Sequence, residues 1–151
     1  MSIKTINFPD ARTGRFTKNY SRVDNELRAE ATDYHTRQPY SVLVAVLFLP
    51  VESCDDGKGS GASSFGAAVQ YFRGRIGRSG PNDNVELFEA FFIGLYDQNY
   101  ETPTSFFDVA SAPPRARRPK PEELLSFDQV IARIVGKFQC RNEPEFEWAA
   151  D

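Results

Sequence analysis

Three acids and one lysine lie in a glycine-rich segment near the middle of the chain. Glu52, Asp55 and Asp56 are followed by Lys58, and three glycines alternate with other residues through the segment. An apolar run ends just before it and an amphipathic pattern begins near Ser63, so the segment is predicted to join a strand to a helix. Carboxylates after a strand are typical ligands of Mg²⁺ in phosphodiester chemistry. Glu52, Asp55 and Asp56 are therefore a candidate metal site, with Lys58 as a candidate catalytic group.

The same segment is also typical of a phosphate-binding loop at a helix N-terminus. Lys58 and the backbone N–H groups of Gly59, Gly61 and Ser63 would hold the anion. The Walker A motif does not fit, because it places the lysine and a hydroxyl directly after its last glycine, whereas Lys58 precedes Gly59. The alternating glycines do not match a dinucleotide fingerprint either. The segment is left as either a ligand-binding loop or a flexible linker.

Nuclease and thiol chemistry gain little further support from the sequence. A restriction-nuclease-like core normally carries a Glu-x-Lys strand, and this chain contains no such triplet. Cys54 follows the apolar run, but the neighbouring acids are expected to raise its pKa and oppose thiolate formation. His35 and Cys140 are distant in sequence, so no zinc-ligand spacing results.

Basic residues collect in separate segments of a chain whose formal net charge is −3. One group follows the amphipathic pattern after residue 64, where cations also stabilise a helix C-terminus. The other lies in a proline-rich stretch, and both are predicted to contact a protein partner or the phosphates of a nucleic acid. The predicted binding residues are Arg73, Arg75, Arg78, Arg115, Arg117, Arg118 and Lys120.

Composition narrows the class of protein. A hydrophobic content of 40% with thirteen Phe is enough for a folded core, and excess aromatic surface favours self-association or a protein partner. The N-terminus lacks the features of an export signal, which favours a cytoplasmic location and free thiols. The longest apolar run, residues 42–51, is too short to span a membrane.

Residue patterns predict one α/β (or α+β) domain behind a basic N-terminal arm. The arm covers residues 1–20 and the domain residues 21–151, with an exposed Pro/Arg-rich connector at 113–121. The domain is expected to contain a small, mixed, partly parallel sheet with a right-handed βαβ unit. Strands are predicted at 40–49, 90–96 and 105–109, and helices at 21–36, 64–76 and 126–139. Ser126 and Gln129 are predicted to form a capping box at the start of the last helix.

The features combine into two functional hypotheses. The first is a non-catalytic binding or accessory module without a cofactor, which contacts a protein partner and also nucleic acid through its basic segments. The second is a Mg²⁺-dependent nuclease or phosphohydrolase that uses the acidic segment after the central strand. Whether the protein is an enzyme is left open, and the first hypothesis is preferred because the acids lack a preorganised base.

Overall fold

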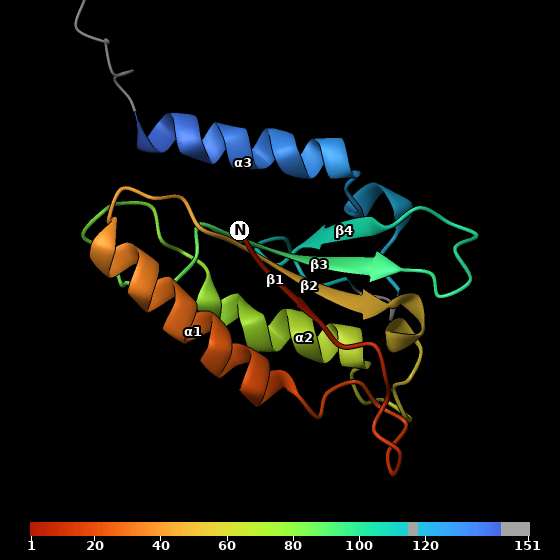
Figure 1. The fold of residues 1–151 in the computed structure, drawn as a ribbon. Coiled ribbons are helices and arrows are strands. Elements are labelled where there is room, and N and C mark those ends of the chain that lie inside the picture. Colours follow the sequence, from red (N-terminus) through yellow and green to blue (C-terminus); the bar gives the residue numbers. More distant parts are fainter. Residues whose placement is uncertain (115–117, 143–151) are drawn as a thin grey trace, which may run out of the picture.

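The computed structural model describes residues 1–114 and 118–142, and these ranges form one four-stranded sheet with three α-helices (Figure 1). The sheet has the order β1-β2-β3-β4, in which the first three strands are parallel and β4 is antiparallel. The strands are β1 (Ser2–Thr5), β2 (Val44–Pro50), β3 (Ala90–Tyr96) and β4 (Ser105–Asp108). The helices are α1 (Tyr20–Arg37), α2 (Ser64–Phe72) and α3 (Phe127–Arg141), with short 3₁₀ helices η1 (Val51–Cys54), η2 (Arg73–Arg75) and η3 (Pro121–Glu123). This arrangement confirms the predicted small α/β fold with a mixed sheet.

The two central strands are the ones that the sequence predicts most directly. Both are continuous apolar segments, which suits strands covered on both faces. They pair in parallel register, with Leu47 opposite Ile93, and α2 lies between them in the chain. The predicted βαβ unit with two parallel strands is therefore confirmed.

Strand β1 lies within the segment predicted as an arm, and the sequence analysis did not predict it. It pairs in parallel with β2, with Ile3 opposite Val46. The Ser2 hydroxyl and the Lys4 ammonium group both donate to Glu30 of α1. Polar contacts therefore hold this edge strand against α1, which explains why it carries no apolar signal.

Helix α2 is shorter than predicted. It ends at Phe72, whereas a helix to residue 76 was expected, and that expectation was wrong by four residues. The chain tightens into η2, and Ile76 then takes an extended conformation and forms a parallel bridge with Phe88. Ile76 therefore does not continue the helix and instead packs, partly buried, against the main hydrophobic core.

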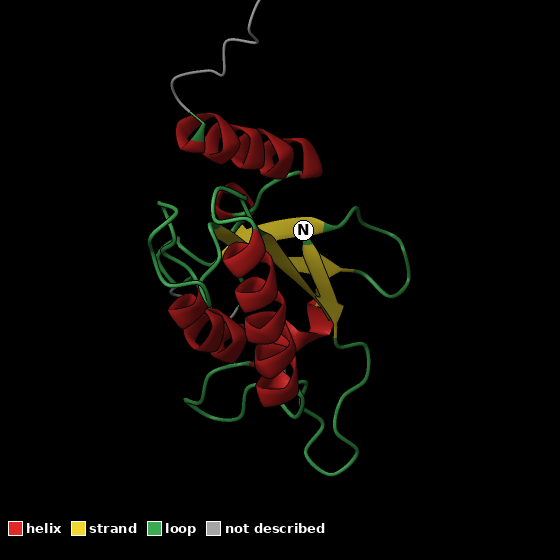
Figure 2. Ribbon diagram, turned by 60° about the vertical axis from the view of Figure 1, so that its left-hand side comes forward, coloured by secondary structure: helices red, strands yellow, loops and turns green. Residues whose placement is uncertain are grey.

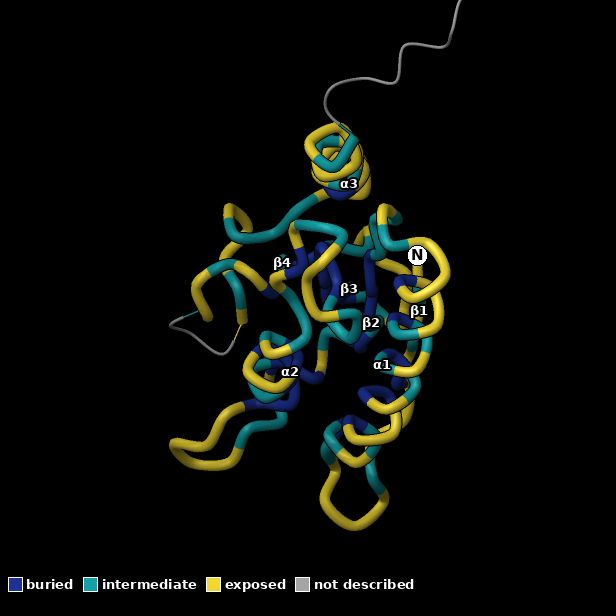
Figure 3. The backbone as a smooth tube through the Cα atoms, turned by 90° about the vertical axis from the view of Figure 1, so that its left-hand side faces the viewer, coloured by how far each residue is buried: buried dark blue, intermediate teal, exposed yellow. Residues whose placement is uncertain are grey.

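The helices divide unequally between the two faces of the sheet. Helices α1 and α2 lie together on one face, and α3 is the described helix on the other (Figure 2). Residue-level burial shows the same asymmetry, because Val130 is the one buried residue of α3 and most of the helix is exposed (Figure 3). Ser126 begins α3 through the predicted capping box with Gln129, in which each side chain accepts from the other residue's backbone N–H.

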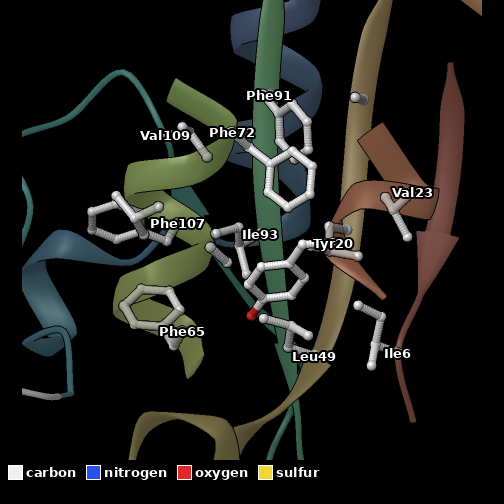
Figure 4. Close-up of a cluster of buried hydrophobic side chains, with 14 of the residues drawn as sticks. Ile6, Tyr20, Val23, Leu49, Phe65, Phe72, Phe91, Ile93, Phe107 and Val109 are labelled. Atoms are coloured by element: carbon white, nitrogen blue, oxygen red, sulfur yellow. The ribbon is translucent and has the colours of Figure 1, made fainter. Parts of the chain in front are cut away.

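The larger core fills the space between the sheet and α1 and α2 (Figure 4). Phenylalanine rings dominate it, and those of Phe72 and Phe91 stack with centroids 5.0 Å apart. Phe65 and Phe107 meet edge to face at 5.4 Å. Ring pairs of this kind add to the stability that area burial alone provides. No described helix is both long and apolar enough to cross a membrane.

Candidate functional site

The acidic segment holds the start of α2 in place. Asp56 accepts hydrogen bonds from the Ser64 backbone N–H at 2.6 Å and from the Ser64 hydroxyl. The Ser63 hydroxyl accepts from the N–H of Gly66 at 3.1 Å, which makes Ser63 the N-cap. These bonds satisfy N–H groups that a helix N-terminus leaves unpaired. The local role of Asp56 and Ser63 is thus to begin a helix.

The other members of the proposed metal site point to different partners. Asp55 forms an ion pair with Arg118, at 2.9 Å from its Nε. Glu52 and Lys58 are exposed. Within residues 1–114 and 118–142, no group of three or more Asp, Glu, His or Cys side chains lies close enough together to hold a metal ion. The three acids that are neighbours in sequence therefore do not form such a group in the described structure.

The strand order also indicates whether the sheet forms the usual crevice for a nucleotide. Ligands of open α/β sheets bind where the strand order reverses and helices switch faces. Here β1, β2 and β3 follow in sequence order, and both connecting helices lie on the same face. The parallel part of the sheet has no such reversal, so the usual crevice is not formed.

A cavity of about 320 Å³ does lie at the carboxyl ends of β2 and β3. Its walls are largely apolar, with Val51, Leu95 and Leu124 beside Arg118 and the buried Cys54. Burial raises the pKa of the Cys54 thiol to about 12, and the neighbouring carboxylates act in the same direction. The expected direction of that shift is confirmed, although burial is the larger cause. A thiol with this pKa is protonated at neutral pH and is a poor nucleophile.

Basic residues near the end of α2 are engaged inside the domain. Arg73 donates to the backbone carbonyls of Val109, at 3.2 Å, and Ser111. Arg75 forms a bidentate ion pair with the buried Asp24 of α1, at 2.8 Å for the longer bond. Their hydrogen-bonding groups therefore hold the end of α2 to α1 and to the segment after β4.

The remaining basic residues do not form one patch in the described ranges. Arg78 is buried, Arg118 is paired as described above, and Lys120 is exposed with its ammonium 3.8 Å from Glu122. Arg115 and Arg117 lie outside the described residues. Contact of these residues with nucleic acid stays a prediction.

A buried charged cluster is a feature that the sequence analysis missed. Glu89 accepts from Arg141 at 2.6 Å, and Arg78 Nε lies 3.3 Å from the same carboxylate. His35 places Nε2 3.5 Å from Glu89 and its Nδ1 2.9 Å from the Val85 carbonyl oxygen. The cluster connects α1, the segment before β3 and the last residue of α3. No sequence signal links these residues, because they are separated by 11 to 106 positions.

Helix α3 leaves most of its apolar side uncovered. Val130 is 1% exposed and packs on the sheet, but four other apolar side chains are between 38% and 59% exposed. They follow one another at spacings of four, four and three residues, so they form one continuous band on the helix. We refer to this band as the α3 stripe; its members are Phe127, Ile131, Val135 and Phe138.

The α3 stripe lies on the flank of the helix that is turned away from Arg133. Arg133, on the opposite flank of the helix, forms an ion pair with Asp108 of β4. At 100° per residue, every member of the stripe lies more than a quarter turn away from Arg133, and Phe127 at its start contacts the Phe106 ring of β4 with centroids 6.2 Å apart. Among the described residues, this is the largest set of exposed apolar side chains on one element.

These features define a small α/β domain with a mixed sheet and an apolar surface helix. Comparison with models of known families, with curated proteins and with solved structures finds no match.

Proposed function

We propose that the protein is a non-catalytic binding module that contacts a protein partner through the α3 stripe. The observation that carries the proposal is the exposure of four large apolar side chains in a regular helical band. Soluble domains rarely leave a contiguous apolar patch in water unless a partner covers it. Amphipathic helices commonly dock through residues at such spacings.

The attachment of α3 to the domain supports the same proposal. Its capping box fixes the first turn, and Arg141 at its last residue reaches Glu89 and the carbonyl oxygens of Pro39 and Ser41. A helix tied at both ends presents its outer side in a fixed orientation. A preorganised surface loses less conformational entropy on binding than a flexible one.

Position-specific photocrosslinking in the native host tests the proposal. A benzophenone amino acid replaces Val135 in the stripe, and in a matched protein it replaces Cys140, which is exposed on the opposite flank. The expected result is a defined adduct from position 135 that is absent from position 140 and is lost on Phe138→Glu. Equal adducts from both positions, or none from position 135, would contradict the proposal.

A further inference from the structure

We infer that the partner of the α3 stripe is a second copy of this chain, bound through an antiparallel pairing of the two α3 helices. The inference rests on the proposed function, because it names the occupant of the same surface. Three features of the described residues support it: the spacing of the stripe, the charges around it, and the space beside α3.

The stripe is self-complementary when it is reversed. In an antiparallel pair, Phe127 of one copy lies opposite Phe138 of the other, and Ile131 lies opposite Val135. The midpoints of these two pairs fall within half a residue of each other, which is less than about 1 Å along a helix axis. One two-fold axis therefore brings both pairs into contact, as a closed dimer interface requires.

The border of the stripe offers little charge for a strongly charged partner to recognise. The residues that flank it on its solvent side are Asp128, Ala132, Gln139 and Asn142, of which one is charged. In the antiparallel arrangement, the two copies of Asp128 lie at opposite ends of the interface. The arrangement thus avoids a like-charge contact, and the two helix dipoles oppose each other favourably.

The sheet face beside α3 has room for another helix. Helices pack with axes about 8–10 Å apart, and neighbouring strands are about 4.8 Å apart, so two helices fit side by side over four strands. Helices α1 and α2 fill one face in this way. On the other face Ile3 of β1 is 59% exposed, although its register partner Val46 is buried beside α3. The β1 edge of this face is therefore open beside Val46, which packs in one cluster with Val130 of α3.

The area of the stripe predicts a weak dimer. Phe127 and Phe138 are 59% and 57% exposed. With roughly 200 Å² for a fully exposed ring, the two rings present roughly 230 Å². Ile131 and Val135 add to this, but the stripe stays near half of the roughly 800 Å² per partner of a standard interface. The dissociation constant of the dimer is therefore expected to be micromolar or higher, so the dimer fraction depends strongly on protein concentration.

Sedimentation velocity of the full chain under reducing conditions tests for the dimer. From low to several hundred micromolar protein, the sedimentation coefficient of the wild type is expected to rise from that of a monomer to that of a dimer. Val135→Glu is expected to weaken association at least tenfold, whereas Cys140→Glu places the same charge on the opposite flank and leaves it unchanged. Circular dichroism and thermal melts verify that both variants are folded. A wild type that stays monomeric, or an equal loss in both variants, would overturn the inference.

Disulfide trapping tests the direction of the helices. In a Cys140→Ser background, copies with Ile131→Cys are mixed with size-tagged copies carrying Val135→Cys, and Cys54 is buried and does not compete. The mixed cross-link is expected to exceed both cross-links between identical copies. A dominant cross-link between two Ile131→Cys copies indicates parallel helices and contradicts the pairing. In a separate sample, the wild-type chain reports the background of random collision, because its exposed Cys140 lies on the opposite flank.

The two proposals can fail separately. If the chain is monomeric but position 135 still cross-links another protein in the host, the second copy is refuted and the binding module stands. If Phe146→Ala with Trp148→Ala produces a dimer that the wild type does not form, the C-terminal segment is the occupant and the inference fails. If position 135 gives no adduct of any kind, both proposals fail.

Discussion

Replacing Glu89 with glutamine perturbs the carboxylate on which the buried charged cluster depends. One oxygen of Glu89 accepts from the Leu43 backbone N–H at 2.7 Å, and the other accepts from Arg141 at 2.6 Å. Arg78 lies 3.3 Å away, and His35 lies 3.5 Å away. Glutamine keeps the size of the side chain and one carbonyl oxygen, but it removes the negative charge and introduces two N–H donors. The two arginines share one oxygen and the Leu43 backbone N–H uses the other, so either both arginines or Leu43 then face a donor in place of an acceptor.

The expected loss of stability is large because the charged side chains of the cluster are almost fully shielded from water. The side chains of Glu89, Arg78 and Arg141 are 3%, 0% and 4% exposed. Removing one partner of a buried ion pair typically costs about 3–5 kcal/mol, since the remaining charge is left without compensation. A domain of this size is stable by about 5–15 kcal/mol, so the substitution is expected to remove about a fifth or more of the free energy of unfolding.

Urea unfolding followed by fluorescence or circular dichroism measures this effect. With a slope near 2 kcal/mol per molar urea, a loss of about 4 kcal/mol lowers the midpoint by about 2 M. The control is Glu122→Gln, because that side chain is 69% exposed and its nearest cation is 3.8 Å away. The control is expected to change stability by less than about 0.5 kcal/mol. A loss below about 1 kcal/mol for Glu89→Gln would refute the view that this cluster fixes α3 and β3 together.

Other substitutions test the fold and the candidate sites. Gly136→Ala is expected to stabilise the protein by about 0.5–1 kcal/mol in urea unfolding, because a Cβ there meets no atom within 4 Å and alanine favours a helix. Gly94→Ala is expected to cost about 1–3 kcal/mol, since its Cβ would lie 2.7 Å from a phenylalanine ring of β2. Asp56→Ala is expected to lower the free energy of unfolding by about 1–2 kcal/mol, because the hydrogen bonds to Ser64 at the start of α2 are lost. The loss is expected to be the same with and without millimolar Mg²⁺. A Mg²⁺-dependent difference in melting temperature between wild type and variant would restore the metal-site hypothesis. Iodoacetamide at neutral pH is expected to label Cys140 and not Cys54, because Cys54 is buried and its pKa of about 12 keeps it as a thiol. Cys54 is expected to react only after urea unfolds the chain. Mass spectrometry distinguishes the two sites, and equal labelling of the folded protein would contradict the burial of Cys54.

The parts of the fold that sequence predicts are those with a strong local pattern. The continuous apolar run before Pro50 and the one at 90–96 produce the central parallel pair, and Ser126 with Gln129 produces the predicted capping box. Strand β1 has four residues, and polar contacts to Glu30 hold two of them. A short edge strand of this kind resembles an arm in sequence, because its position is set by a helix more than twenty residues away.

The partners of charged residues could not be predicted for a different reason. Arg75 follows α2 as a cation at a helix end would, but its guanidinium binds Asp24, which is 51 residues away. Likewise Arg118 binds Asp55 across 63 residues. A charge in sequence shows neither whether it faces solvent nor which opposite charge the fold brings beside it. The predicted basic surface therefore depended on an assumption that local sequence cannot test.

Helix α3 shows what the apolar periodicity of a sequence does not reveal. The pattern at 126–139 predicts an apolar side, and the helix has one, but the sheet buries Val130 and leaves the side chains of the α3 stripe between 38% and 59% exposed. An apolar periodicity shows which side of a helix is buried when the protein functions. It does not show whether that side is buried in the core of one chain or in an interface with another. A helix whose apolar side is wider than the surface beneath it is therefore the point at which the sequence indicates a contact that the described residues of one copy do not supply. In this chain, the exposed apolar surface of α3 is concentrated in the four residues of the stripe. Because their spacing matches itself when the helix is reversed, a second copy is the occupant that needs the fewest additional assumptions.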